Sequence, residues 1–254
     1  MEKLQRNWLV RLRKFARSDK HGTDLPLKLP DMMNREDHYM IVERRLFLMT
    51  PGLYGLTFFA KSDFEEFTRQ AGEYAKRMIA DSNRNEDEYL FRVASLAAAL
   101  NEFPAVEFGA PFKTMRSGMT YRGSGIAVIQ WRMEPNSVYP AHNHPGYNGI
   151  TVGIRGECRM RNFDFVGTAP DMKSRETFLV KETQDNILRP GTVCSMMSTK
   201  RDNIHQLEAG NEVVIGADII AKVGPDQGFS FVTIEDQARN PKDRTYEATW
   251  KELG

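Results

Sequence analysis

The sequence predicts a mainly β fold, an antiparallel sandwich or barrel, preceded by an α-helical hairpin. From Phe108 onward, short apolar runs are separated by Gly, Pro, Asn or Asp, which is typical of such sheets. Before that point, apolar residues recur at helical spacing in two segments. The 254 residues can bury a substantial core. We divide the chain into an arm (1–62), a helical hairpin (63–104) and a barrel with a polar C-terminal tail (105–254).

The N-terminal arm begins with forty polar and basic residues that lack sustained periodicity, which favours disorder or a loose arm. In residues 40–62, Arg44 and Arg45 precede an apolar run of about a dozen residues, too short to span a bilayer comfortably. One interpretation is a twin-arginine-type export signal, with Met33 or Met40 rather than Met1 as the true start. The other is a buried strand or helix at the edge of the fold. The sequence thus leaves a periplasmic and a cytoplasmic location equally open, and it predicts no stable membrane span.

Two helices follow. Asp63 is placed to cap the first, with Glu66 three residues later, and Asn85 and Glu88 repeat this pattern for the second. Both helices carry an apolar stripe, which predicts a packing surface that buttresses the barrel or forms an oligomer contact.

The predicted strands are the runs GIAVIQWRM, YNGITVGIR, CRMRNFDF, ETFLVKE, TVCSMMS, HQLEAGNEVVIGADIIA and FSFVTIE. The last stretch, DQARNPKDRTYEATWKELG, is polar and is expected to pack as a tail across the outside.

The charge balance and the cysteine content exclude some functions. A formal net charge of +1, from 35 basic and 34 acidic residues, gives no electrostatic footprint for nucleic acid. Cys158 and Cys194 each lie in an apolar, strand-like stretch, so we expect buried, unreactive thiols.

Three of the five histidines form a pattern that predicts a metal site. His142 and His144 are one residue apart, and side chains at that spacing project to the same face of a strand. His205 closes the set if its strand lies beside the first. Three neutral nitrogens on one side of an ion leave positions open opposite, as a catalytic site requires. Without the third histidine and the nearby glycines, a surface or core role would be the better reading of the pair.

These residues resemble the motifs of the cupin superfamily, which implies a double-stranded β-helix, or jelly-roll, barrel. In the first motif, His142 and His144 are present, Gly149 stands where glutamate is expected, and Gly156 follows. The second motif is matched by Pro190, Gly191 and then His205 after a longer gap than usual. The missing glutamate leaves a metal set of three histidines.

Within the superfamily, the chain resembles the thiol dioxygenases of the plant cysteine oxidase and cysteamine dioxygenase group. The matches are His-x-His-Pro-Gly, at residues 142–146, and Asp-Asn-Ile-His, at residues 202–205, where the group has Gly-Asn-Ile-His. Asp218 matches the group's aspartate to within one residue. The Pro-Pro-Tyr stretch of the group is replaced by AKVGPDQGFSF, and no Cys-x-Tyr pair occurs. The resemblance covers roughly Phe108 to Thr233.

The resemblance implies Fe(II) held by His142, His144 and His205, and oxidation of a small thiol such as cysteine or cysteamine to its sulfinate with O2. Asp218 would orient a histidine or a water by a hydrogen bond; its alternative role is a strand-end aspartate that satisfies backbone groups. The expected partners are the thiol and O2, with no nucleic acid, and an oligomer is left open.

The substrate pocket is predicted less sharply. A thiol that bears a carboxylate calls for an arginine, and Arg159 and Arg161 lie near the first motif on one face of their strand. Tyr147 is a further candidate for the pocket. The ordinary alternative for these arginines is a solubilising role.

Two rival functions use the same features. One is a metal-dependent cupin enzyme that acts on a non-thiol substrate. The other is a non-catalytic cupin that binds a small molecule or partner.

Overall fold

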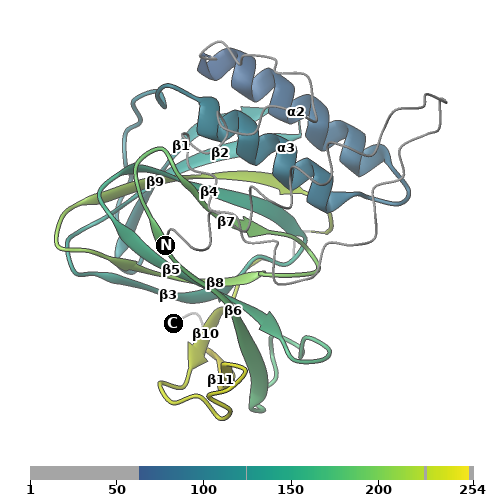
Figure 1. Cartoon of the computed structure of the whole chain (residues 1–254), viewed down its shortest axis with the longest axis vertical. Coiled ribbons are helices and arrows are strands. Elements are labelled where there is room, and N and C mark those ends of the chain that lie inside the picture. The colour runs from purple at the N-terminus through teal and green to yellow at the C-terminus, as the bar shows by residue number, and fades with distance from the viewer. Residues whose placement is uncertain (1–62, 124, 226–227, 252–254) are drawn as a thin grey trace, which may run out of the picture. The chain divides into compact units, whose positions relative to one another are not determined.

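The computed structural model describes residues 63–123, 125–225 and 228–251. The predicted arm and the twin-arginine-type segment, residues 1–62, lie outside the described residues, as do His21 and His38. In the described part, two helices precede a series of antiparallel strands (Figure 1). The helices are α2 (Phe64–Ala80) and α3 (Glu86–Ala99).

The strands form two sheets. The five-stranded sheet has the order β1 (Met115–Gly123), β2 (Ile126–Met133), β9 (Val214–Lys222), β4 (Tyr147–Arg155) and β7 (Val193–Met197). The second sheet closes on itself in the order β10 (Phe231–Ile234), β11 (Thr245–Lys251), β6 (Phe178–Leu188), β5 (Cys158–Phe165), β8 (Ile204–Ala209) and β3 (Val138–Asn143).

The strand pairing is nested, which defines the topology. β5 pairs with β6, β4 with β7, β3 with β8 and β2 with β9, always antiparallel. A long hairpin folded over in this way, with successive pairs in alternate sheets, is a jelly roll, or double-stranded β-helix. The predicted fold class, a mainly β cupin-type barrel preceded by a helical hairpin, is therefore confirmed.

The helical hairpin begins where the capping pattern predicts. The Asp63 carboxylate accepts a hydrogen bond from the Glu66 backbone N–H at 2.8 Å, and Asn85 Oδ1 accepts one from the Glu88 N–H at 3.1 Å. The apolar stripes pack on the outer face of the five-stranded sheet, against residues such as Val128, Ile150, Val152 and Ile219. The hairpin thus buttresses the barrel. No helix of the described part is long and apolar enough to cross a bilayer.

The strand predictions differ from the structure at several places. The run from His205 to Ala221 was expected as one strand, but it divides at Gly210, whose N–H donates to the Glu157 carbonyl at 2.9 Å in a turn between β8 and β9. Residues 115–123 and 138–143 are strands although their sequence lacks a continuous apolar pattern. The C-terminal stretch was expected as an external tail, but its residues 245–251 form β11, which pairs with both β6 and β10.

Trp131 is buried between the two sheets. It is 1% exposed and packs with residues of both sheets, such as Met133, Met160 and Leu207. Its indole lies directly over Gly216, its partner residue on β9. A Cβ at position 216 would be 2.3 Å from the Trp131 ring, so only glycine leaves room for the indole.

We therefore expect Gly216→Ala to lower the free energy of unfolding by about 2 kcal/mol or more, because the tryptophan must leave its position. Chemical denaturation followed by tryptophan fluorescence measures the change. Gly109→Ala is the control, since a Cβ there meets its nearest atom at an ordinary 3.5 Å. Equal stability of the two variants would contradict this packing.

Candidate metal centre

Two of the three histidines, His142 and His205, lie on neighbouring antiparallel strands. His142 on β3 and His205 on β8 are direct partners in the antiparallel ladder, so their side chains project to the same face. Their Nε2 atoms lie 3.0 Å apart. The sequence prediction that a later strand brings His205 beside the His-x-His pair agrees with this register.

His144 lies one residue beyond the end of β3, where the chain turns toward β4. Its Nε2 is 3.2 Å from Nε2 of His205. The turn depends on Gly146, which has φ +79° and whose added Cβ would lie 2.7 Å from the Pro225 carbonyl oxygen. The three imidazoles thereby converge, with their ligand atoms within 4.8 Å of one another.

This donor set fits a divalent metal ion. Two imidazole nitrogens bound at right angles, each about 2.1 Å from one ion, are about 3.0 Å apart. The observed separations of 3.0 and 3.2 Å match that arrangement. All three nitrogens belong to one wall of the pocket, so the ion's remaining positions face the pocket interior.

The protonation of the three rings also suits metal binding. Burial lowers the pKa of His142 to about 4. Burial, with repulsion from the neighbouring rings, lowers the pKa values of His144 and His205 well below the ordinary value. The rings are therefore neutral near pH 7. Nδ1 of His142 lies 2.9 Å from the Pro140 carbonyl, which only accepts, so the proton sits on Nδ1 and the Nε2 lone pair is free to bind.

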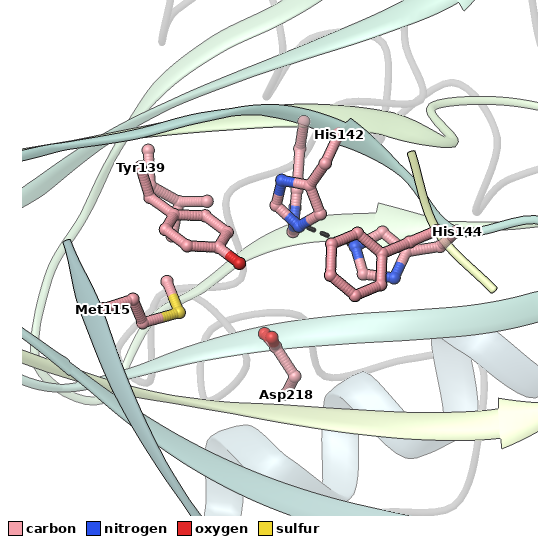
Figure 2. Close-up of a pocket in the computed structure, with 8 residues that line it drawn as sticks. Met115, Tyr139, His142, His144 and Asp218 are labelled. Carbon is pink, nitrogen blue, oxygen red and sulfur yellow. Dashed lines mark hydrogen bonds between the residues drawn. The ribbon is translucent and has the colours of Figure 1, made fainter. Parts of the chain in front are cut away.

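The histidines form one side of a cavity of about 130 Å³ between the two sheets. Figure 2 shows Tyr139 and Asp218 directed into this space, Tyr139 from the histidine strand β3 and Asp218 from β9 on the opposite sheet. The lining consists of Met115, Tyr139, His142, His144, His205, Leu207, Asp218 and Phe229. Among the described residues, this lining includes one carboxylate and no arginine or lysine. The cavity is comparable to one that holds benzene, so it suits a small ligand.

Asp218 is oriented within the pocket by a neighbouring strand. Thr151 Oγ1 donates to Asp218 Oδ1 at 2.7 Å. Burial raises the pKa of Asp218 to about 6, while the hydrogen bond from Thr151 limits the rise. A carboxylate with this pKa is mostly ionised at pH 7 and faces the histidines across the cavity.

Tyr139 is a pocket residue that the sequence analysis missed. Between Tyr139 and His142, β3 contains a β-bulge: these residues are three apart, whereas their partners Leu207 and His205 are two apart. The extra residue turns Tyr139 to the same face as His142, against the strict alternation of a regular strand. Its pKa is raised to about 12 by burial and by the charge of Asp218, so the phenol keeps its proton and can donate it in a hydrogen bond.

Arg159 and Arg161, proposed from the sequence as pocket residues, do not line the pocket. On β5, Cys158 and Met160 face the core between the sheets, so the alternating arginines project to the other face. There Arg159 binds Asp185 at 2.8 Å and Glu208 at 3.3 Å, and Arg161 binds the buried Glu182 at 3.2 Å. The two arginines therefore pair with acidic residues outside the lining of this pocket.

Tyr147, the third candidate for the pocket, starts β4 and is half-buried, and it is not among the lining residues either. At the position of the missing glutamate, a Cβ on Gly149 would be 2.7 Å from the terminal methyl group of Met197, so a side chain there requires this flexible methionine to shift.

Comparisons with known proteins add little to this geometry. A scan of protein-family models and a search of curated proteins give no match. Among solved structures, KdgF from Halomonas sp. is 11% identical with a TM-score of 0.34, over 46% of this chain and 87% of that protein. Oxalate oxidase with glycolate is 12% identical with a TM-score of 0.35, over 47% and 55%. Recombinant pro-11S globulin of pumpkin is 12% identical with a TM-score of 0.36, over 50% and 30%. Such likeness carries no functional argument, and the fold rests on the strand pairing.

We expect the two thiols of the chain to be unreactive in the native protein. Cys158 and Cys194 are free, and burial raises the pKa of each to about 12. Labelling with Ellman's reagent at pH 8 should be slow in buffer and complete within minutes in 6 M guanidinium. Rapid labelling of either thiol in the native state would contradict the prediction.

Proposed function

We propose that the protein is an iron-dependent thiol dioxygenase that converts a small thiol to its sulfinic acid. The observation that carries the proposal is the convergence of three neutral imidazole nitrogens, 3.0 and 3.2 Å apart, on one wall of a small pocket, with no fourth metal-ligating side chain grouped with them among the described residues. The residues His142, His144 and His205 would hold the ion, and Fe(II) is the ion that the sequence resemblance implies.

The reaction balances without a further reductant. A thiol R–SH and one O2 give R–SO2H: the sulfur loses four electrons, the dioxygen gains four, and both oxygen atoms end on sulfur. Ferrous iron, when bound, supplies the site at which thiol and dioxygen meet.

The protein side chains have separate tasks. The histidines hold the ion from one side, and the hydroxyl of Tyr139 is placed to donate a hydrogen bond into the cavity from the same wall. Met115, Leu207 and Phe229 supply apolar surface that limits water around the reacting atoms.

The pocket favours a thiol that carries an amine and no carboxylate, such as cysteamine. Its lining offers the Asp218 carboxylate as the partner of an ammonium group, held in place by Thr151. A substrate carboxylate would instead face Asp218 with no cationic residue of the lining to neutralise it.

The activity is tested by oxygen uptake of the iron-reconstituted full chain with cysteamine, cysteine, 3-mercaptopropionate and a peptide with an N-terminal cysteine. We expect one O2 consumed per sulfinate formed, fastest with cysteamine or the peptide, and loss of at least about 100-fold in His144→Ala, since a ligand is removed. Chelation of the iron should abolish the activity in the wild type. Bound metal without turnover of any of the four thiols would favour a cupin enzyme with a non-thiol substrate, and absence of bound metal would favour a binding protein.

The role of Asp218 is tested by substrate preference. Asp218→Asn keeps the size of the side chain and the Thr151 hydrogen bond but removes the charge. We expect the ratio of kcat/KM for cysteamine over 3-mercaptopropionate to fall about tenfold or more, as loss of a buried charge pair requires. Asp185→Asn is the matched control, because Asp185 pairs with Arg159 outside the pocket. An unchanged ratio in Asp218→Asn would remove Asp218 from substrate recognition.

A further inference from the structure

We propose that the loop between β7 and β8, residues 198–203, is a clamp that ties α3 to the metal ligands, with Asn203 and Glu86 as positioning residues for His144 and His205. The inference rests on the proposed metal site and extends it to a loop and a helix that do not line the pocket. Hydrogen bonds at both ends of the loop and within it carry the inference.

The side chain of Asn203 holds the backbone of His144. Its Oδ1 accepts from the His144 N–H at 3.0 Å, and its Nδ2 donates to the His144 carbonyl at 3.0 Å. The same Nδ2 also donates to the Ser198 carbonyl at 3.0 Å. His144 lies beyond the end of β3, and both parts of Asn203 hold it there: besides the side-chain amide, the Asn203 backbone carbonyl accepts from the same His144 N–H at 3.1 Å. Because Asn203 is two residues before His205, one side chain joins the segments of two ligands.

The clamp loop itself is a tight turn in which Ser198 and Asp202 are buried. Ser198 Oγ accepts from the backbone N–H groups of Lys200 and Arg201, each at 3.1 Å, and the Ser198 N–H donates to the Arg201 carbonyl at 3.0 Å. Asp202 has φ +56° and no solvent exposure, and its carboxylate accepts from Thr183 and Arg201. The position of Asn203 is therefore fixed by the turn that precedes it.

The other end of the clamp is the start of α3. Glu86 is 6% exposed, and its carboxylate accepts from the Thr199 N–H at 3.0 Å and from the Thr199 hydroxyl at 2.7 Å. Asp87 forms an ion pair with Arg201 at 2.5 Å. A glutamate this buried is costly unless its charge is satisfied, and here the partner is the loop. The cap of the helix is the neighbouring Asn85, so Glu86 is not needed for that purpose.

These contacts matter for metal binding because ligand nitrogens must be held to within about 0.5 Å of their places. The paired strands β3 and β8 fix His142 and His205, but His144 depends on the turn and on Asn203. Loosening the clamp should therefore weaken metal binding more than it weakens the fold.

The test measures Co²⁺ affinity of the full chain by competition with a chelator, together with the Co²⁺ visible spectrum and the stability of the metal-free protein. We expect Asn203→Ala and Glu86→Ala to bind Co²⁺ about 10 to 100 times more weakly than the wild type and to alter the visible bands. Glu86→Ala removes the hydrogen bonds that the carboxylate accepts from the Thr199 N–H and hydroxyl.

Asn85→Ala is the matched control. Asn85 caps the same helix through Glu88, so its loss destabilises α3 while the clamp contacts stay in place. We expect wild-type Co²⁺ affinity and spectrum in this variant. Asn203→Asp, which keeps the bond accepted from His144 and loses both donated bonds, serves if Asn203→Ala does not fold, and it should also weaken binding.

The outcomes separate this inference from the proposed reaction. Unchanged Co²⁺ affinity in the Asn203 and Glu86 variants, or an equal loss in Asn85→Ala, would overturn the clamp. Weaker binding in the clamp variants would support it even if the wild type oxidises no thiol, in which case only the proposed reaction fails. A wild-type chain that binds no Co²⁺ would overturn both.

Discussion

The register of the β3–β8 strand pair is the constraint on which the site depends. It sets His142 opposite His205, with their Nε2 atoms 3.0 Å apart. The β-bulge in β3 then brings Tyr139 to the same face. A slip of β3 by one residue would turn His142 and Tyr139 away from the cavity together. The closed sheet helps to hold this register. The edge of β3 that does not pair with β8 pairs with β10, where Phe231 is the partner residue of His142.

Burial makes the histidine wall of the pocket neutral but leaves a negative charge on the opposite wall. It lowers the histidine pKa values, so the ligands are neutral and need no deprotonation at pH 7. The same burial raises the pKa of Asp218 to about 6, which leaves a carboxylate on the opposite wall. Glycine at position 149 supplies no fourth, anionic ligand. A divalent ion held by three neutral ligands keeps its full charge, which favours an anionic substrate atom such as a thiolate in the open positions.

The sequence predicted the fold class, the helix caps and the three histidines, because each has a local signal at fixed spacing. Tyr139 was not predictable, since alternation places it on the other face and the bulge that reverses this is set by pairing with β8. For Arg159 and Arg161, alternation showed that they share a face but not which one, and that depends on which side of β5 faces the five-stranded sheet. β11 was missed because its residues are polar and amphipathic, and its strand character comes from the exposed backbone edges of β6 and β10.

The position of the helices explains why the clamp loop lies where it does. α2 and α3 pack on the outer face of the five-stranded sheet, while the pocket is on its inner face, so the sheet separates them. Packing through the sheet can shift the pocket only by moving whole strands, and a close-packed sheet resists that. β7 is an edge strand, so the loop that follows it can pass around the sheet from one face to the other. Glu86 meets this loop on the helix side and His144 meets it on the pocket side, so a short chain of hydrogen bonds joins the two layers at this edge.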